Sequence, residues 1–234
     1  MDRTYLFPPF RRPAALVSGT AQLFPVNRIF CVAKNYQAHA KEMGTTVDKG
    51  AQSPSYFQKN PVNLVACRSE IDYPPGTSDC HYEMELVVAI GRPGFELAEE
   101  DASELIFGYA CGLDMTRRDL QRQAKDQGGP WDAAKDFEQS AVLSPIVPMS
   151  DTGVLDAGRI ELRLNGETRQ SSDLSKMIWS VPEIISDLSR LYHLEPGDLI
   201  YTGTPEGVGA VAAGDLLEGS IERVGSLSLR ITAS

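Results

Sequence analysis

Short apolar runs, several of them alternating with polar residues, dominate the pattern along the chain. Six runs have the length and the β-branched and aromatic content of strands: residues 28–33, 83–90, 105–114, 159–166, 198–204 and 226–231. The Asn165-Gly166 pair adds a two-residue hairpin signal at the end of the fourth run. The chain is therefore predicted to be rich in strands.

Three segments are predicted to be helices. The first covers residues 35–43 and stops at Gly44, which readily takes the positive φ of a helix end. The second begins where Thr116 and Asp119 have the spacing of a capping box, and it runs to Gly128.

The third helix is predicted to begin at another capping box, formed by Ser180 and Glu183, with Pro182 in the first turn. Apolar residues at helical spacing predict a buried face made of Ile184, Ile185, Leu188, Leu191 and Tyr192. The helices do not alternate regularly with the strands, which argues against a doubly wound sheet or a (β/α)8 barrel. The predicted fold class is mixed α+β, mainly β, with a few covering helices.

Composition narrows the class of protein. Residues 1–25 are rich in proline and are predicted to be an extended lead-in, while residues 26–234 show no linker or repeat and are predicted to form a single domain. The net charge is −10 without a basic cluster, so no nucleic-acid partner is expected.

No apolar stretch approaches the length of about 18 residues that crosses a membrane, and no signal-peptide core is present, so the cytoplasm is the expected location. The cysteines form no C-x-x-C pair and are expected to be reduced and mostly buried: Cys31, Cys67, Cys80 and Cys111.

Two acids interrupt the apolar run from Asp79 to Ile90. In a strand, Glu83 and Glu85 share a face with His81, and close carboxylates in a poorly solvated site require a cation or protonation. The alternative is an amphipathic strand whose acids face water. Asp114 ends another apolar run, and three carboxylates without a nearby thiol are the hard-oxygen ligands that suit Mg²⁺, Mn²⁺ or Ca²⁺.

Further polar residues have the spacing of a site. His39 and Glu42 are three residues apart on the first helix, where a carboxylate can orient an imidazole as a general base. Arg118 and Gln121 share a face of the second helix, and Lys135 follows. Taken alone, each group is more often part of a solvated helix surface. The segment YTGTPEGVGA lacks the Lys of a phosphate-binding loop, and we interpret it as a tight turn that presents threonines.

Seven stretches, in order, resemble the fumarylacetoacetate hydrolase family, most of all its short acylpyruvate and fumarylpyruvate hydrolases. They are VAKNYQAHAKEMG, HYEMELVVAIG, GYACGLDMTRRDLQ, GPWDAAKDF, NGETRQ, MIWSVPEII and LEPGDLIYTGTPEGVG, and they fall within residues 27–230. The resemblance implies a β-roll or sandwich-like catalytic domain, commonly a homodimer.

The resemblance also implies roles for individual residues. Glu83, Glu85 and Asp114 would be the ligands of one divalent cation per chain, Mg²⁺ or Mn²⁺. The catalytic residues would be His39 and Glu42, which activate water, and Lys135, which neutralises oxyanion charge. The substrate-binding residues would be Arg118, Gln121 and Thr204.

The implied reaction is metal-dependent hydrolysis of the carbon–carbon bond of an acylpyruvate, a small anionic 2-oxo acid. Fumarylpyruvate, cleaved to fumarate and pyruvate in aromatic compound catabolism, is the leading case. The alternatives are decarboxylation of oxaloacetate, isomerisation or decarboxylation of a 2-hydroxy-diene dioate, and a non-catalytic binding protein on the same fold. Retention of both His39 and Glu42 favours hydrolysis, because hydrolysis needs activated water. Gln58 and Asn60 depart from the family pattern, in a stretch that the resemblance places at the acyl pocket.

Overall fold

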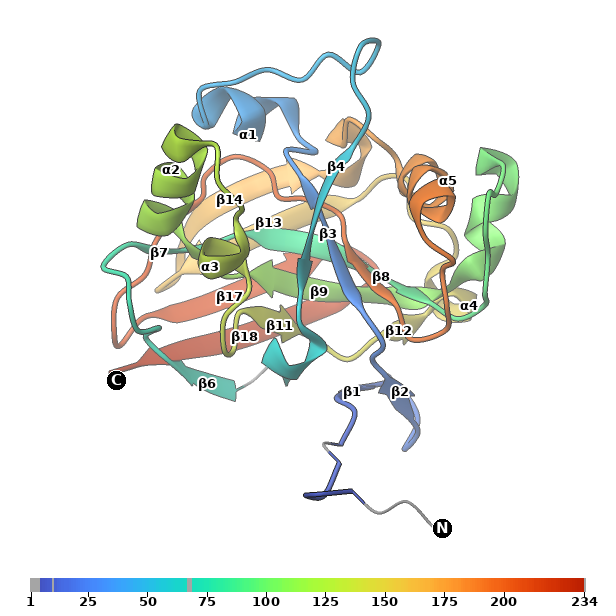
Figure 1. The fold of residues 1–234 in the computed structure, drawn as a ribbon, viewed down its shortest axis with the longest axis horizontal. Coiled ribbons are helices and arrows are strands. Elements are labelled where there is room, and N and C mark those ends of the chain that lie inside the picture. The colour runs from blue at the N-terminus through green and yellow to red at the C-terminus, as the bar shows by residue number, and fades with distance from the viewer. Residues whose placement is uncertain (1–4, 10, 67–68, 234) are drawn as a thin grey trace.

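Two curved β-sheets form the framework of the protein. The computed structural model describes residues 5–9, 11–66 and 69–233. Within these residues the larger sheet has eight strands (Figure 1). Its order is β4 (Ser55–Lys59), β3 (Ile29–Ala33), β15 (Leu199–Tyr201), β8 (Met84–Ile90), β9 (Ile106–Asp114), β11 (Ala141–Leu143) and β5 (Leu64–Ala66), with β12 (Val147–Pro148) paired to β9.

The second sheet lies against the first. Its order is β14 (Glu167–Asp173), β13 (Arg159–Leu164), β17 (Leu216–Ile221), β18 (Gly225–Thr232) and β6 (Ser69–Asp72). A small sheet joins β10 (Thr116–Arg117), β7 (Cys80–Tyr82) and β16 (Gly209–Ala210), and a hairpin joins β1 (Ala14–Leu16) to β2 (Leu23–Pro25). Parallel pairing links β3 to β15, β5 to β11 and β6 to β18, and the other named pairs are antiparallel.

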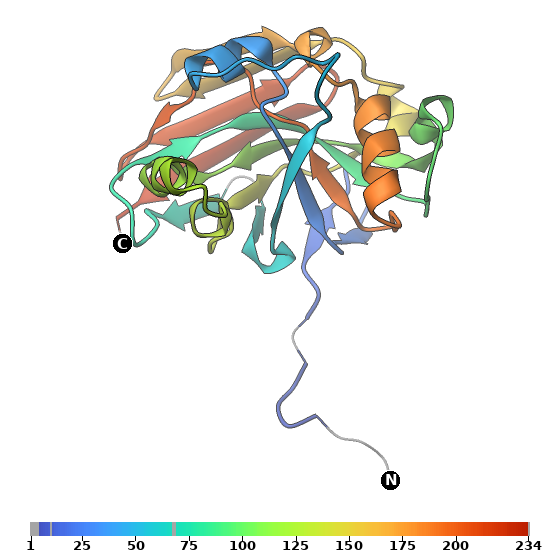
Figure 2. The same cartoon turned by 45° about the horizontal axis from the view of Figure 1, so that its top comes forward.

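Short helices cover the sheets. The α-helices are α1 (Gln37–Glu42), α2 (Arg118–Gln127), α3 (Asp132–Lys135), α4 (Met149–Thr152) and α5 (Val181–Leu191). The 3₁₀ helices are η1 (Pro61–Asn63), η2 (Glu99–Leu105) and η3 (Leu174–Lys176). Helices α1 and α2 lie on the same side of the molecule, away from α5, in both ribbon views (Figures 1 and 2). None of the helices in the described ranges is long and apolar enough to cross a membrane.

The large sheet is buried on both faces at its centre. Met84, Leu86 and Val88 of β8 pack into the main core, whereas Val87 and Ala89 pack into a second core on the other face. Double burial explains the continuous apolar run of this strand, because neither face meets water. The predicted mixed, mainly β fold is confirmed.

Local signals in the sequence had mixed outcomes. The hairpin at Asn165 and Gly166 is confirmed, with positive φ at both residues between β13 and β14. The cap of α5 is also confirmed, because Ser180 and Glu183 make both bonds of a capping box. The predicted cap of α2 is wrong: Thr116 belongs to β10, and its hydroxyl donates to the Asp114 carbonyl instead.

The buried face of α5 is shorter than predicted. Ile184, Ile185 and Leu188 are buried, but Leu191 is 61% exposed and Tyr192 is 38% exposed. The helix ends at Leu191, so helical spacing no longer applies to Tyr192.

The N-terminal segment projects from the body of the molecule (Figure 2). No helix or strand occurs in residues 5–9 or 11–13, and the β1–β2 hairpin follows. The boundary at residue 26 remains a prediction. Cys31, Cys80 and Cys111 are buried and unbridged, as expected, whereas Cys67 lies outside the described residues.

The cap of α5 gives a test of stability. Ser180→Ala removes one bond of the capping box and should lower the free energy of unfolding by about 1 kcal/mol. Urea denaturation followed by circular dichroism measures the change. Ser53→Ala, at an exposed loop position, is the matched control and should change stability by less than about 0.5 kcal/mol. Equal effects of the two substitutions would contradict the role of the cap.

Candidate active site

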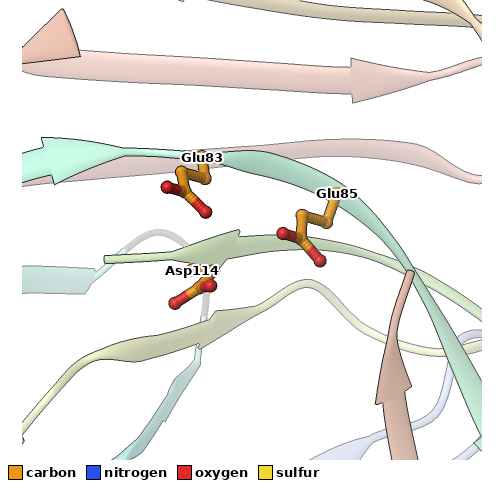
Figure 3. A group of neighbouring side chains, drawn as sticks. All are labelled: Glu83, Glu85 and Asp114. Carbon is orange, nitrogen blue, oxygen red and sulfur yellow. The ribbon is translucent and has the colours of Figure 1, made fainter. Parts of the chain in front are cut away.

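Three buried carboxylates meet where β8 and β9 run side by side. Glu83 directly precedes β8, Glu85 is its second residue, and Asp114 ends β9 (Figure 3). The amide of Asp114 donates to the Glu83 carbonyl at 2.9 Å, which fixes the two strand ends together. The exposed fractions are 4%, 2% and 0%, so the alternative of a wet strand face is wrong.

The chemistry of this carboxylate triad fits a divalent cation. One oxygen from each of Glu83, Glu85 and Asp114 lies within 4.8 Å of the others. Asp114 Oδ1 is buried and has no aligned hydrogen-bond donor among the described residues, although Lys59 Nζ lies 2.8 Å away. Three hard oxygen ligands, one of them without a hydrogen bond, are a donor set for Mg²⁺ or Mn²⁺.

Buried cations stabilise two of the three acids. Lys135 Nζ donates to Glu83 Oε2 at 2.8 Å and to Asp114 Oδ2 at 2.6 Å. Arg118 donates to Glu83 Oε1 at 2.5 Å. In the described part of the chain, Glu85 has no such cation and accepts a hydrogen bond only from the amide of Gly203, at 2.8 Å.

The pKa values follow this unequal distribution of charge. Although burial opposes ionisation, Lys135 and Arg118 hold the pKa of Glu83 well below its usual range. Burial, together with the charges of Asp114 and Glu83, raises the pKa of Glu85 well above its usual range. Glu85 is therefore the carboxylate whose ionised form would gain most from a bound cation.

His39 and Glu42 form the pair expected on α1. His39 Nδ1 lies 3.2 Å from Glu42 Oε2, and the His39 side chain is buried. The Gly207 amide donates to Glu42 Oε1 at 3.1 Å and so fixes the carboxylate. A neutral His39 that donates from Nδ1 to Glu42 leaves Nε2 free to accept a proton.

The predicted substrate-binding residues come together, but they also bind protein groups. Arg118 donates to Gln121 Oε1 at 2.5 Å as well as to Glu83. Thr204 accepts a hydrogen bond from Gln170 at 2.9 Å. Lys135 also donates to the Thr116 hydroxyl at 2.7 Å, so its three N–H groups all have partners. The substrate and oxyanion roles of these residues stay predictions.

A cavity of about 500 Å³ unites these groups. Eight of the nine predicted site residues line it, namely His39, Glu42, Glu83, Glu85, Arg118, Gln121, Lys135 and Thr204. Asp114 lies beneath the lining, fully buried against Lys135. The volume falls within the usual range of small-molecule sites, about 300 to 1,000 Å³.

Sequence reasoning missed two residues that hold the site in place. Lys59 of β4 is buried and donates to the Met115 and Lys135 carbonyls, and it also contacts Asp114. Gln170 of β14 accepts a hydrogen bond from the Met84 amide at 3.0 Å and donates to Thr204. Lys59 stands between Gln58 and Asn60 at the end of β4, so no local pattern marked it as buried. Gln170 had none beyond its place in NGETRQ.

Comparison with known proteins establishes the family. Residues 28–232 match the family described as fumarylacetoacetate (FAA) hydrolase, C-terminal. The chain belongs to the fumarylacetoacetate hydrolase family. The predicted membership is confirmed.

Named relatives cover most of this family member. A fumarylpyruvate hydrolase of Ralstonia sp. is 57% identical over 81% of the chain and 98% of the relative. A mitochondrial oxaloacetate tautomerase of Rattus norvegicus is 41% identical over 88% of the chain and 92% of the relative. The crystal structure of fumarylpyruvate hydrolase from Pseudomonas aeruginosa in complex with Mn²⁺ and pyruvate is 44% identical, with a TM-score of 0.95 over 99% of this chain and all of that one.

Glu85 provides a test of the carboxylate triad that does not depend on activity. A raised pKa means that ionisation of Glu85 destabilises the metal-free fold as the pH rises above the usual glutamate range. Glu85→Gln should therefore raise the Tm of the chelated protein at pH 8. It should also weaken Mn²⁺ binding by more than about 100-fold, since even residues that only orient a ligand contribute 10- to 100-fold.

Calorimetric titration with Mn²⁺ and thermal melts in chelator measure the two effects. Glu99→Gln, at an exposed position of η2, is the control and should change neither quantity appreciably. Normal Mn²⁺ affinity in Glu85→Gln would exclude the triad as the metal site.

Proposed function

We propose that the chain hydrolyses the carbon–carbon bond of an acylpyruvate, with fumarylpyruvate, cleaved to fumarate and pyruvate, as the substrate. The observation that carries the proposal is that two acids of the buried triad and the His39–Glu42 pair line one cavity. The 57% identity to a fumarylpyruvate hydrolase supports this choice of substrate.

Charge favours an anionic substrate. A divalent cation held by Glu83, Glu85 and Asp114 would supply a Lewis acid for the 2-oxo acid end of the substrate. Lys59, Arg118 and Lys135 equal the three carboxylates in number, although they contact only Glu83 and Asp114, so a bound divalent cation would give the site net positive charge. An anionic ligand would offset that charge in a site from which most water is excluded.

The α1 pair supplies the hydrolytic step. Glu42 accepts a hydrogen bond from Nδ1 of His39, which leaves Nε2 unprotonated. Nε2 then takes a proton from water as the water attacks the distal carbonyl. The fixed Glu42 carboxylate then stabilises the imidazolium. The proton on Nε2 is available for the pyruvate carbanion that leaves when the carbon–carbon bond breaks.

Tautomerisation of oxaloacetate is the second candidate, because a relative 41% identical to this chain carries that name. It requires proton transfer but no attack by water. Oxaloacetate decarboxylation and diene-dioate isomerisation remain the further alternatives. The proposal also includes a homodimer, Mg²⁺ or Mn²⁺ as the metal, a cytoplasmic location and a role in aromatic compound catabolism.

A substrate panel separates these activities. With Mg²⁺ or Mn²⁺, fumarylpyruvate should lose its enol absorbance and yield equal amounts of fumarate and pyruvate, and chelation should abolish the reaction. The same preparation is assayed for oxaloacetate tautomerisation and decarboxylation. A kcat/KM for either oxaloacetate reaction far above that for any acylpyruvate would replace the hydrolase assignment.

The pair on α1 is tested by non-additivity. His39→Ala should lower kcat by about 100-fold or more, the scale of a lost general base, without weakening Mn²⁺ binding. Glu42→Gln should cause a related loss, and the double variant should lose less than the product of the two. Steady-state rates and Mn²⁺ titration give the readouts. Multiplicative losses would mean that the two residues act independently.

A further inference from the structure

Glu83 and Glu85 of the carboxylate triad line the cavity together with His39 and Glu42 of α1. In fumarylpyruvate, the pyruvyl carboxylate and the acyl carboxylate lie on opposite sides of the carbonyl that water attacks. With the pyruvyl end at the triad and the attacked carbonyl at the α1 pair, the acyl carboxylate must extend past that pair. It needs a cation there, because an anion without a partner is costly in a partly enclosed site.

Several cations line the cavity, but most already have anionic partners. The set consists of Lys34, Arg118, Arg122, Lys125 and Lys135. Arg118 and Lys135 are committed to the triad. Arg122 donates to Asp79 Oδ2 at 2.7 Å. Two lysines without an acidic partner remain.

The two remaining lysines differ in their surroundings. Lys125 is exposed near the end of α2, and its Nζ donates to the Met43 carbonyl at 3.3 Å. Lys34 is half-buried, follows β3 directly and stands five residues before His39. In the described ranges Lys34 makes neither a hydrogen bond nor an ion pair. A partly desolvated ammonium group without a partner attracts an anion more strongly than an exposed one.

The backbone of Lys34 has an uncommon conformation. Its φ is 59°, in the left-handed region that residues other than glycine rarely adopt. The anchor is the buried side chain of Asn35, which donates to the Trp179 carbonyl at 2.9 Å and the Thr202 carbonyl at 2.8 Å. It also accepts from the Trp179 amide at 2.8 Å. Three bonds to two distant segments thus fix the chain beside Lys34, at the edge of the cavity.

We propose that Lys34 binds the carboxylate at the acyl end of the substrate and so selects acylpyruvates with an anionic acyl group. This inference rests on the proposed acylpyruvate hydrolysis and adds the residue that recognises the acyl group.

Paired substrates isolate this contact. Fumarylpyruvate carries the acyl carboxylate, and acetylpyruvate has a neutral acyl group. Lys34→Gln should lower kcat/KM for fumarylpyruvate about tenfold or more beyond its effect on acetylpyruvate, the scale of one hydrogen bond to a charged group. Lys34→Arg keeps a cation on the same strained backbone and should retain most of the preference. Both substrates are assayed with the same preparation, so the ratio of the two kcat/KM values does not depend on the amount of folded protein.

Two further lysines serve as comparisons. Lys41→Gln removes an exposed cation from α1 that does not line the cavity, and it should leave the substrate ratio as in the wild type. Lys125→Gln should shift the ratio less than Lys34→Gln. A larger shift with Lys125→Gln, or equal losses on both substrates with Lys34→Gln, would overturn the proposal.

Product inhibition tests the same contact with acetylpyruvate as the only substrate. Inhibition of acetylpyruvate cleavage by fumarate should weaken about tenfold in Lys34→Gln, whereas inhibition by pyruvate should change much less. Unchanged fumarate inhibition would overturn the role of Lys34 while leaving the hydrolase assignment intact. A wild-type protein that cleaves neither acylpyruvate would overturn the proposed function itself.

Discussion

The ammonium group of Lys135, buried between Glu83 and Asp114, is the interaction on which the rest of the site depends. Carboxylates from two paired strand ends would repel each other in a medium with little water. Despite burial, which favours the neutral amine, the charges of Asp114 and Glu83 raise the pKa of Lys135 and keep it ionised. The lysine thereby allows the acids to approach as closely as a metal site requires.

The positive charge is unevenly distributed over the cluster, and this leaves one acid for a metal to stabilise. Lys59, Arg118 and Lys135 all contact Glu83 or Asp114, whereas Glu85 has only the Gly203 amide among the described groups. A buried acid with a raised pKa is the point at which a divalent cation stabilises the structure most. Metal binding and an anionic substrate are thus linked by the same charge balance.

Segments distant in the sequence form the cavity, and buried amides connect them. Asn35, which lies just before α1, joins that part of the chain to the segments at Trp179 and Thr202. Gln170 joins β14 to the start of β8 and to the turn at Thr204. The small residue in that turn is necessary, because Gly203 has φ +98° and a Cβ there would lie 2.7 Å from the Asn35 Cβ. These contacts are made across the whole fold, so no local pattern could have predicted them.

The sequence by itself determined the features that are local or carried by motifs. The β8 and β9 strands, the Asn165-Gly166 turn and the Ser180 cap each follow from residues within a few positions of one another. Seven ordered motifs were enough to predict the family. The same local reasoning failed at Thr116. This residue pairs with β7 in a strand, and its hydroxyl accepts a hydrogen bond from Lys135, so it does not cap a helix. Only the tertiary structure decided that Lys59 lies against Asp114, that Arg118 is bound to Glu83, and that the side chain of Lys34 has no partner among the described residues. Such partnerships depend on three-dimensional proximity and desolvation, which residue spacing along the chain does not encode.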